Sequence, residues 1–416
     1  MRSEMGASKA GTLRATAPLL LVGLMALSLF INYIDRGNLA TGATQIRADL
    51  KLSATAYGAL GAGFYFAYAF CQLPAGALSD RIGGKLVLAL GALLWSVSTL
   101  LTGFVQGFMG LFVLRMMLGM GESVAFTTTS KIIASNVPKA QMGLANGVIG
   151  FGYLVGPAVG TLLGGLMMAR WGWRFTFFAF GAVSLLWLLP WSRVRIQEAR
   201  PAETADHEPV TMRQILRRRA LWGAALGHFA GNWNWYFILG YLPMYLEMQR
   251  GFSKEQMAEV VSSAYLVNAL AALFAGWAFD KAIVRGWSPS FTLKAPLALA
   301  HLAGLGCMLA MPFMPITACI ALLFVYEIFL GFSSPAYFMI PQIMAGPSAA
   351  ARWVGVQNMM GNMPGIIGVF FAGVLIDAGN GSYGTAFLLA GLVNVLGLIG
   401  WLVILPKVAP VDWNAA

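Results

Sequence analysis

Charged residues are scarce in this sequence. They make up 10% of its 416 residues, whereas 58% are hydrophobic, and the mean hydropathy is +0.72. An ordinary soluble domain carries about 25% charged residues, so this composition excludes a soluble fold. Apolar runs of about 20 residues, long enough to cross a bilayer as a helix, recur along the chain. The sequence therefore predicts an all-α membrane protein.

Cysteine and histidine are also rare, with three of each. Cys71, Cys307 and Cys319 lack a CxxC spacing, and we interpret them as buried free thiols, although Cys307 and Cys319 could approach each other at one membrane face. The histidines are isolated, and no metal or nucleophile constellation is visible. The nucleotide loop GxxxxGK[ST] of an ATP-driven pump is absent as well. These absences argue against an enzyme and predict no metal or cofactor.

Long polar stretches are limited to the N-terminus and one central segment. The first 16 residues are basic and lack a small-residue cleavage site, so we expect no removed signal peptide. The central stretch is charged and contains proline, which is typical of a linker. We predict an N-terminal half at 1–192, a cytoplasmic linker at 193–218 and a C-terminal half at 219–416.

Twelve apolar runs are long enough to span a membrane. The gap between the eighth and the ninth is the least clear, because Trp287, Pro289 and Lys294 interrupt the pattern. The predicted spans lie near 17–39, 55–78, 85–106, 108–130, 140–168, 174–192, 219–245, 256–280, 293–312, 316–340, 352–377 and 384–405.

Basic residues are distributed unequally between the two sides of these spans. Of the 27 lysines and arginines, 19 fall at the termini, the linker and the other even-numbered gaps, 6 in the odd-numbered gaps and 2 within spans. This bias predicts cytoplasmic termini in a bacterial inner membrane. It also explains the net charge of +11 without nucleic acid, and the basic run 217–219 is expected to meet lipid headgroups.

Ionisable residues inside the spans are the strongest functional signal. Arg115 and Glu122 face each other two helical turns apart in the fourth span, and Asp35 and Arg36 follow Asn32 near the end of the first. Each charge at membrane depth costs at least about 2.5–3.5 kcal/mol, so such residues are functional candidates by default. Two arginines and two carboxylates in one half predict an anion site coupled to a proton.

The gap between the second and third spans carries the motif GALSDRIGGK. Its members are Gly76, Asp80, Arg81, Gly83, Gly84 and Lys85. This motif resembles the loop signature of the major facilitator superfamily, and GWAFDK (Gly276, Asp280 and Lys281) echoes it in the second half. The resemblance implies a major facilitator fold of twelve helices in two pseudo-symmetric halves. We expect Asp80 to hold the halves together near Arg352 and to control the conformational balance.

Within that superfamily the chain resembles the anion:cation symporter family. The similar segments include INYIDRGNL, YFAYAFCQLP, RMMLGMGES and GVQNMMGNMPGI. The resemblance implies that Asp35 and Glu122 carry protons, and that Arg36 and Arg115 engage a substrate carboxylate, which guanidinium binds bidentately. A fixed ion pair that only locks helices is the alternative. Relatives often carry a further acid where this chain has the apolar Leu118.

Polar and aromatic residues in other spans complete the predicted site. Tyr68 matches a substrate-contacting position of the family, whereas Tyr65 could equally pack between helices. Tyr153 stands where sugar-acid relatives have an amide, which favours an aromatic or less hydroxylated acid. The remaining predicted ligands are Asn358, Asn362 and Trp235, although Trp235 could also belong to an interfacial aromatic belt.

Span five carries a glycine pattern that resembles the antiporter motif of the superfamily. The pattern consists of Gly143, Gly152, Gly156, Pro157, Gly160 and Gly164. It describes a kinkable helix whose side-chain-free face allows close packing. Exchange of organic anions or proton-driven export therefore stays open as the alternative to the predicted function. That function is proton-coupled import of a small organic carboxylate, either an aromatic or a sugar acid, by a monomer.

Overall fold

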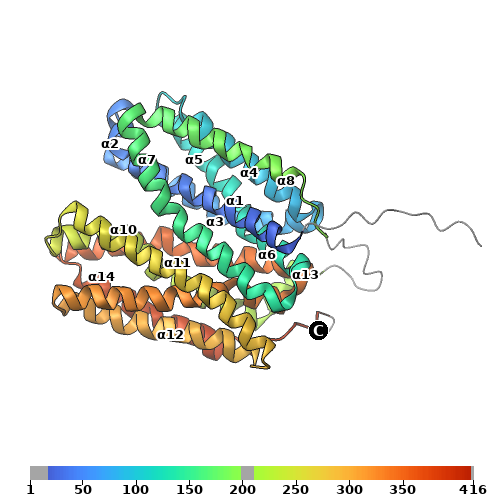
Figure 1. The fold of residues 1–416 in the computed structure, drawn as a ribbon. Helices are drawn as coiled ribbons and strands as arrows, with labels where there is room; N and C mark the ends of the chain where they lie inside the picture. The colour runs from blue at the N-terminus through green and yellow to red at the C-terminus, as the bar shows by residue number, and fades with distance from the viewer. Residues whose placement is uncertain (1–16, 198–209, 414–416) are drawn as a thin grey trace, which may run out of the picture.

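The computed structural model describes residues 17–197 and 210–413, which form two bundles of helices (Figure 1). The first bundle comprises α1 (Pro18–Thr41), α2 (Ala43–Asp49), α3 (Ala54–Ile82), α4 (Gly84–Thr102), α5 (Phe108–Glu122), α6 (Val124–Asn136), α7 (Met142–Leu186) and α8 (Leu188–Ser192). The second comprises α9 (Met212–Arg217), α10 (Arg219–Met244), α11 (Lys254–Val284), α12 (Pro289–Ala310), α13 (Ile316–Ala378) and α14 (Gly384–Leu398). Short helical turns η1 to η4 extend or precede some of these helices.

These helices supply all twelve predicted spans. Among the described residues, eight helical segments are long and apolar enough to cross a membrane. Two of those segments, containing α7 and α13, cover two spans each. The remaining two spans are α3 and α10, whose glycines and polar residues dilute their hydropathy. Six spans lie in each bundle, so the predicted all-α architecture of twelve helices in two halves is confirmed.

Two glycines divide the longest helices into separate spans. Gly172 has φ +80° within α7, and Gly346 has φ +66° within α13. A left-handed backbone of this kind is accessible to glycine at little cost and is strained for other residues. Each glycine therefore marks the turn between consecutive spans. The break at Gly172 lies between the predicted fifth and sixth spans, and that at Gly346 between the tenth and eleventh.

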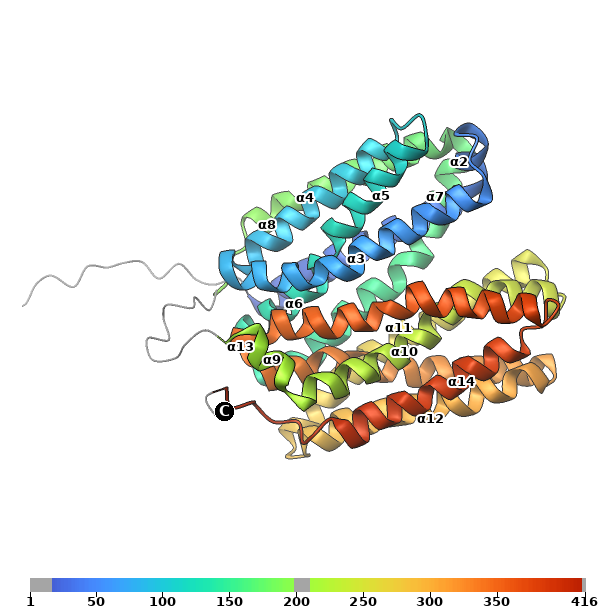
Figure 2. The same ribbon diagram turned by 180° about the vertical axis from the view of Figure 1, so that it is seen from behind.

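The two bundles converge at one end of the molecule and separate at the other (Figure 2). We call the converging end the linker side, because the described residues that flank the linker lie there, as does the C-terminal segment up to Trp413. The opposite end is the α2 side. Residues 198–209 of the predicted linker lie outside the described residues, as does the basic start of the chain, so the exact domain boundaries stay a prediction.

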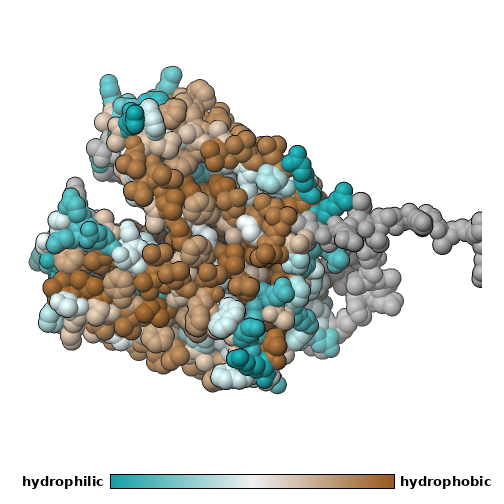
Figure 3. All heavy atoms as spheres, viewed as in Figure 1, coloured by the Kyte–Doolittle hydropathy of each residue, from teal (hydrophilic) through white to brown (hydrophobic). Residues whose placement is uncertain are grey.

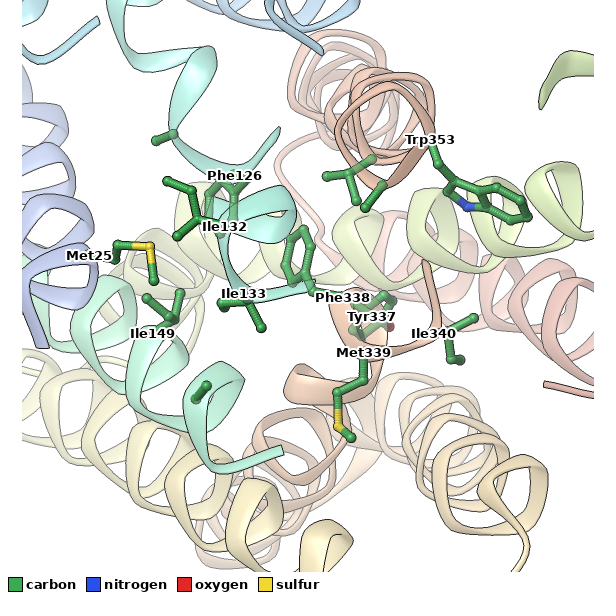
Figure 4. Close-up of a cluster of buried hydrophobic side chains, with 14 of the residues drawn as sticks. Met25, Phe126, Ile132, Ile133, Ile149, Tyr337, Phe338, Met339, Ile340 and Trp353 are labelled. Carbon is green, nitrogen blue, oxygen red and sulfur yellow. The ribbon is translucent and has the colours of Figure 1, made fainter. Parts of the chain in front are cut away.

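A continuous apolar core joins the two bundles on the linker side. The rings of Phe126 on α6 and Phe338 on α13 stack 4.9 Å apart at an interplanar angle of 7° (Figure 4). From this stack α6 continues towards the linker side, where Ile132 and Ile133 belong to the same buried cluster. The face shown in Figure 3 is also largely apolar between its two polar ends, as a lipid-facing surface requires.

The glycines of span five allow α7 to pack directly against α1. A Cβ atom at Gly156 would lie 2.8 Å from the backbone oxygen of Phe30, and one at Gly160 would lie 2.9 Å from Cα of Ile34. Small residues at helix contacts permit this approach in membranes, where dispersion drives helix association. From Gly152 to Gly164 the glycine pattern is thus explained by packing against α1 within one half, which is independent of the direction of transport.

We predict that Gly156→Ala destabilises the protein by about 1–3 kcal/mol, because the new methyl group overpacks the contact between α1 and α7. Gly165→Ala is the matched control on the same helix, since its Cβ would meet only Thr41 Cγ2 at 3.6 Å. Thermal unfolding of the two purified variants in lipid measures the difference. Equal unfolding midpoints for the two variants would show that α1 and α7 can move apart to admit the methyl group without loss of stability.

Candidate functional site

A cavity lies between the two bundles, near the middle of the spans. Aromatic side chains make up eight of the 17 residues that line it. They are Tyr33, Tyr68, Phe126 and Tyr153 from the first half, and Trp235, Tyr236, Tyr337 and Phe338 from the second. Figure 3 shows a notch between the halves on the α2 side, whereas the stack of Phe126 and Phe338 lies on the path towards the linker side. The described conformation is therefore closed on the linker side.

An ion pair lies directly behind the aromatic wall of the first half. Arg36 Nε on α1 donates to Glu122 Oε2 on α5 over 2.7 Å. The guanidinium carbon of Arg36 also lies 4.1 Å from the ring centroid of Tyr33 and 4.3 Å from that of Tyr68. Both rings line the cavity, and their faces attract the cation. Arg36 is thus within one aromatic layer of a bound molecule.

Asp35 belongs to the same buried region but has a different partner. Thr99 Oγ1 on α4 donates to Asp35 Oδ2 over 3.2 Å. The second carboxyl oxygen, Oδ1, has no hydrogen-bond partner among the described residues. The side chain is 1% exposed, so Asp35 is enclosed within the first bundle.

Arg115 lies deeper than the sequence predicts for a substrate ligand. Its guanidinium carbon is 4.6 Å from the ring centroid of Phe64, which in turn stacks on Tyr68 at 5.8 Å. Arg115 is not part of the cavity wall. It also does not pair with Glu122, whose partner is Arg36 from a neighbouring helix. In this conformation, Phe64 and Tyr68 separate Arg115 from the cavity.

Several hydrogen-bonding atoms in this region have no partner within the described protein. The buried atoms without a hydrogen-bond partner are Arg115 Nε and Nη1, Arg36 Nη2, Glu122 Oε1, and both side-chain polar atoms of Asn32 and of Gln72. Buried polar groups normally find a partner, because an unsatisfied group costs about 1–3 kcal/mol. Such a concentration of unused donors beside a cavity is typical of a site that receives water or an anionic ligand.

Asparagine and tyrosine side chains from the second half provide further polar groups. Tyr236 Oη donates to Asn362 Oδ1 over 2.6 Å, and Asn232 Nδ2 donates to the backbone oxygen of Gly361 over 2.6 Å. Asn358 Nδ2 is buried without a partner. All of these side chains line the cavity. They leave at least one amide donor available to a ligand.

The structure brings most of the predicted ligands together. Tyr68, Tyr153, Trp235, Asn358 and Asn362 line the cavity. Tyr153 also joins the halves through a hydrogen bond of 2.6 Å between its hydroxyl and Ser334 Oγ. Tyr65 does not line the cavity. Its ring instead packs edge-on against Tyr236 at 5.7 Å, which matches the packing role left open in the sequence analysis.

Other cavity residues were not predicted as ligands. The main ones are Tyr33, Phe126, Asn268, Tyr337 and Phe338. The sequence does contain a signal for Tyr33, because this residue lies inside the INYIDR segment that carries Asp35 and Arg36. The others have no local signal, since an aromatic residue within a span can face lipid, protein or cavity. Their direction depends on how the helices pack.

The loop motif between α3 and α4 lies at the contact between the halves on the linker side. Asp80 forms an ion pair with Arg352 on α13, as expected, and a second with Lys131 Nζ on α6 at 3.1 Å. A Cβ atom at Gly76 would lie 2.7 Å from the backbone oxygen of Ala351. The sequence places Lys131 just outside the predicted span at 108–130. In the structure it lies inside α6 and is 5% exposed.

The remaining members of the motif shape the turn itself. Gly83 adopts φ +95° between α3 and α4, a conformation that favours glycine. Lys85 Nζ donates to the backbone oxygen of Ser192 over 3.0 Å. Gly84 approaches Ile132 closely, since a Cβ there would lie 3.1 Å from its Cγ1. Arg81 is exposed. Asp80 is therefore the member that joins the two halves through charge.

The echo of this motif in the second half forms a corresponding contact. Asp280 on α11 accepts hydrogen bonds of 2.7 Å from the backbone nitrogens of both Gly143 and Leu144, at the start of α7. A carboxylate at this position is stabilised by the helix dipole. Close by, Asn146 and Gln342 exchange two amide hydrogen bonds of 2.7 and 3.0 Å. The two related motifs thus close the linker side together.

Comparison with known proteins agrees with a fold of two helical bundles around a central cavity. The sequence profile described as Major Facilitator Superfamily matches residues 25–369. The chain belongs to this superfamily. A probable sulfoacetate transporter of Cupriavidus necator is 29% identical over 406 residues, covering 93% of this chain and 94% of the relative. A hexuronate transporter of Bacillus subtilis is 26% identical over 377 residues, with 87% and 88% covered.

A solved structure shows the same fold. A proton:xylose symporter of the superfamily superposes with a TM-score of 0.77 at 15% identity, covering 94% of this chain and 95% of the symporter. These relatives confirm the predicted superfamily and the predicted similarity to organic-anion transporters. The protein is a multi-pass membrane transporter, and not an enzyme.

The ion pairs of Asp80 predict a specific effect on conformation. Removing its charge in Asp80→Asn leaves Arg352 and Lys131, both largely buried, without a carboxylate, which destabilises the closed linker side. We expect a cysteine placed at Ser130, a buried position beside Gln342, to react with a thiol reagent at least ten times faster. That change corresponds to about 1.4 kcal/mol.

The matched control is Asp377→Asn, which makes the same change at an exposed residue near the end of α13. It should leave the labelling rate unchanged. If Asp80→Asn also leaves the rate unchanged, its ion pairs do not hold the linker side closed.

Proposed function

We propose that this transporter imports small organic anions together with protons, by alternating access across a bacterial inner membrane with both termini in the cytoplasm. The observation that carries the proposal is the Arg36–Glu122 ion pair behind the cavity wall. It places an anion-binding cation and a protonatable carboxylate in direct contact. Because the two groups are in direct contact, a change in the charge or position of one directly alters the interactions of the other.

The charge balance of the region favours joint binding of an anion and a proton. Arg36 and Arg115 contribute two positive charges, and Asp35 and Glu122 contribute two negative charges when both are ionised. An added anion then makes the region negative, which is costly where the dielectric constant is low. Protonation of one carboxylate restores neutrality. Anion and proton therefore increase each other's affinity, as thermodynamic linkage requires.

The geometry supports the following route for this coupling. In the described state one oxygen of Glu122 accepts from Arg36 Nε, while Arg36 Nη2 has no partner. Protonation of Glu122 removes its charge and frees the guanidinium for a carboxylate or sulfonate, which guanidinium binds through two parallel hydrogen bonds. Asp35 is the second proton carrier in this proposal. Arg115 keeps the region positive when Arg36 turns towards the anion.

The cavity favours a compact anion with few hydroxyl groups. About half of the residues in its wall are aromatic, and Tyr153 already uses its hydroxyl on Ser334. The relatives named above are a probable sulfoacetate transporter and a hexuronate transporter, and of these two substrates sulfoacetate is the smaller and lacks hydroxyls. We therefore rank sulfoacetate-like and aromatic carboxylates before sugar acids. The protein works as a monomer in this proposal, because the cavity lies within one chain.

We expect Arg36→Lys to weaken binding of the transported anion at least thirtyfold, in line with the cost of about 2–5 kcal/mol for truncating a buried hydrogen-bonded charge pair. Lysine keeps the charge but loses the bidentate geometry. Arg115→Lys should reduce affinity less, because Arg115 does not line the cavity. Calorimetric titration of the purified variants measures both affinities. A larger effect at Arg115 would restore the sequence-based assignment of Arg115 as the direct ligand.

Uptake into proteoliposomes tests the proposed function itself. We expect at least one of sulfoacetate, benzoate and D-glucuronate to accumulate under an inward proton gradient, whereas the neutral analogue D-glucose should not. Glu122→Gln should keep exchange of labelled for unlabelled anion but lose at least nine-tenths of the gradient-driven accumulation. Glu259→Gln, an exposed change on α11, is the control and should behave like the unchanged protein.

Three outcomes would contradict parts of this proposal. Full accumulation by Glu122→Gln would move the proton to another residue, with Asp35 as the next candidate. Uptake that occurs only when anion is already present inside the vesicles would favour exchange, the alternative raised by the glycine pattern of span five. Outward pumping of the panel anions under the same gradient would favour export.

A further inference from the structure

Glu327 is a buried carboxyl group for which the proposed function has no role. It lies within α13, in the second half of the protein, and its side chain is 0% exposed. Neither the loop motifs nor the Arg36–Glu122 region involves this residue. The cost of placing an isolated carboxylate at membrane depth makes such a position unusual unless it serves a purpose.

The surroundings of Glu327 contain one hydrogen-bond donor and no cation. Asn268 Nδ2 on α11 donates to Glu327 Oε2 over 2.5 Å. The other oxygen, Oε1, is buried with no partner. Among the described residues, no lysine, arginine or histidine lies within ion-pair distance of this carboxyl. The titratable groups that interact with it are the phenols of Tyr265 on α11 and of its neighbour Tyr326.

An ionised carboxylate in these surroundings would be uncompensated. Burying a single charge without a counter-ion costs several kcal/mol, and such a group becomes neutral instead. A proton on Oε1 removes the charge, while Oε2 keeps the hydrogen bond from Asn268. The unused oxygen is therefore the position where a proton is bound.

Asn268 connects this carboxyl to the cavity. Its side chain lines the cavity wall while also donating to Glu327. The contact is held by the backbone, because Gly331, one turn after Glu327, lies so close to the main chain of Asn268 that an added Cβ atom would collide with its carbonyl oxygen. α11 and α13 thus fix the distance between carboxyl and amide, and an anion beside Asn268 is separated from Glu327 by one side chain.

We propose that Glu327 is a further proton-binding site, located in the C-terminal half and linked to the substrate cavity through Asn268. The link rests on the proposed function, because it requires an anion in the cavity. A negative charge beside Asn268 disfavours ionisation of Glu327 and so retains its proton. The proton and the anion then travel together, in addition to any proton carried by Asp35 or Glu122.

Infrared spectroscopy of the full-length protein in lipid tests the proton site without any substrate. We expect the unchanged protein at neutral pH to show the carbonyl stretch of a protonated carboxyl, which Glu327→Gln removes and the exposed Glu259→Gln retains. Asn268→Leu keeps Glu327 and removes the donor, so the same stretch should move to higher frequency. This second variant keeps the test valid if Glu327→Gln does not fold.

Either of two results would overturn the proton site. A spectrum in which neither Glu327→Gln nor Asn268→Leu alters a protonated-carboxyl band would show that Glu327 is ionised. A band that appears only after sodium is replaced by choline would show that a metal cation occupies the site.

The link to the cavity has its own measurement. For an anion from the panel above that the protein accumulates, we expect Glu327→Gln to lower the number of protons taken up per anion by one, with no change for Glu259→Gln. An unchanged ratio would refute the link. If no panel anion is transported, the proposed function fails, while the infrared result still decides the proton site.

Discussion

The ion pair between Arg36 and Glu122 is the interaction on which the central site depends. It joins α1 to α5 inside the membrane, where neither charge would be stable alone. The aromatic rings of Tyr33 and Tyr68 cover Arg36 on the cavity side, so the pair is protected from water and still within reach of a ligand. Replacing either partner by an apolar residue would leave the other uncompensated. The pair is therefore at once a structural contact and the place where a ligand or proton can alter the structure.

Much of the fold could be predicted from the sequence, because membrane helices follow from hydropathy and length. The predicted span at 219–245, for example, is α10 (Arg219–Met244), and the one at 256–280 lies within α11 (Lys254–Val284). The turns inside α7 and α13 depend on Gly172 and Gly346, whose positive φ angles only the structure reveals. The contact of Asp80 with Arg352 was also predictable, since both residues lie near the linker-side ends of spans in opposite halves.

The details of the site were harder to predict, for a physical reason. Arg115 and Glu122 lie on one face of one helix, but that spacing does not say which residue of another helix completes the pair. Glu122 pairs with Arg36 across the bundle, and Arg115 is separated from the cavity by Phe64. Lys131 and Glu327 carried the same signal as Glu122, a charge within an apolar run, and could have been found. The aromatic wall from α6 and α13 could not, because helix rotation decides which ring faces the cavity.

The contact between Gly143 on α7 and Gly276 on α11 has a consequence for leakage. Each glycine lies so close to the other helix that a Cβ atom on either one would collide with the other's backbone. A gate made of long side chains can open briefly when one rotamer changes, and water or ions can then pass. Here main chain meets main chain, so this part of the barrier can open only by displacement of whole helices. Such a barrier preserves the membrane potential between transport cycles, and its opening is as slow as a rigid-body motion of half the protein.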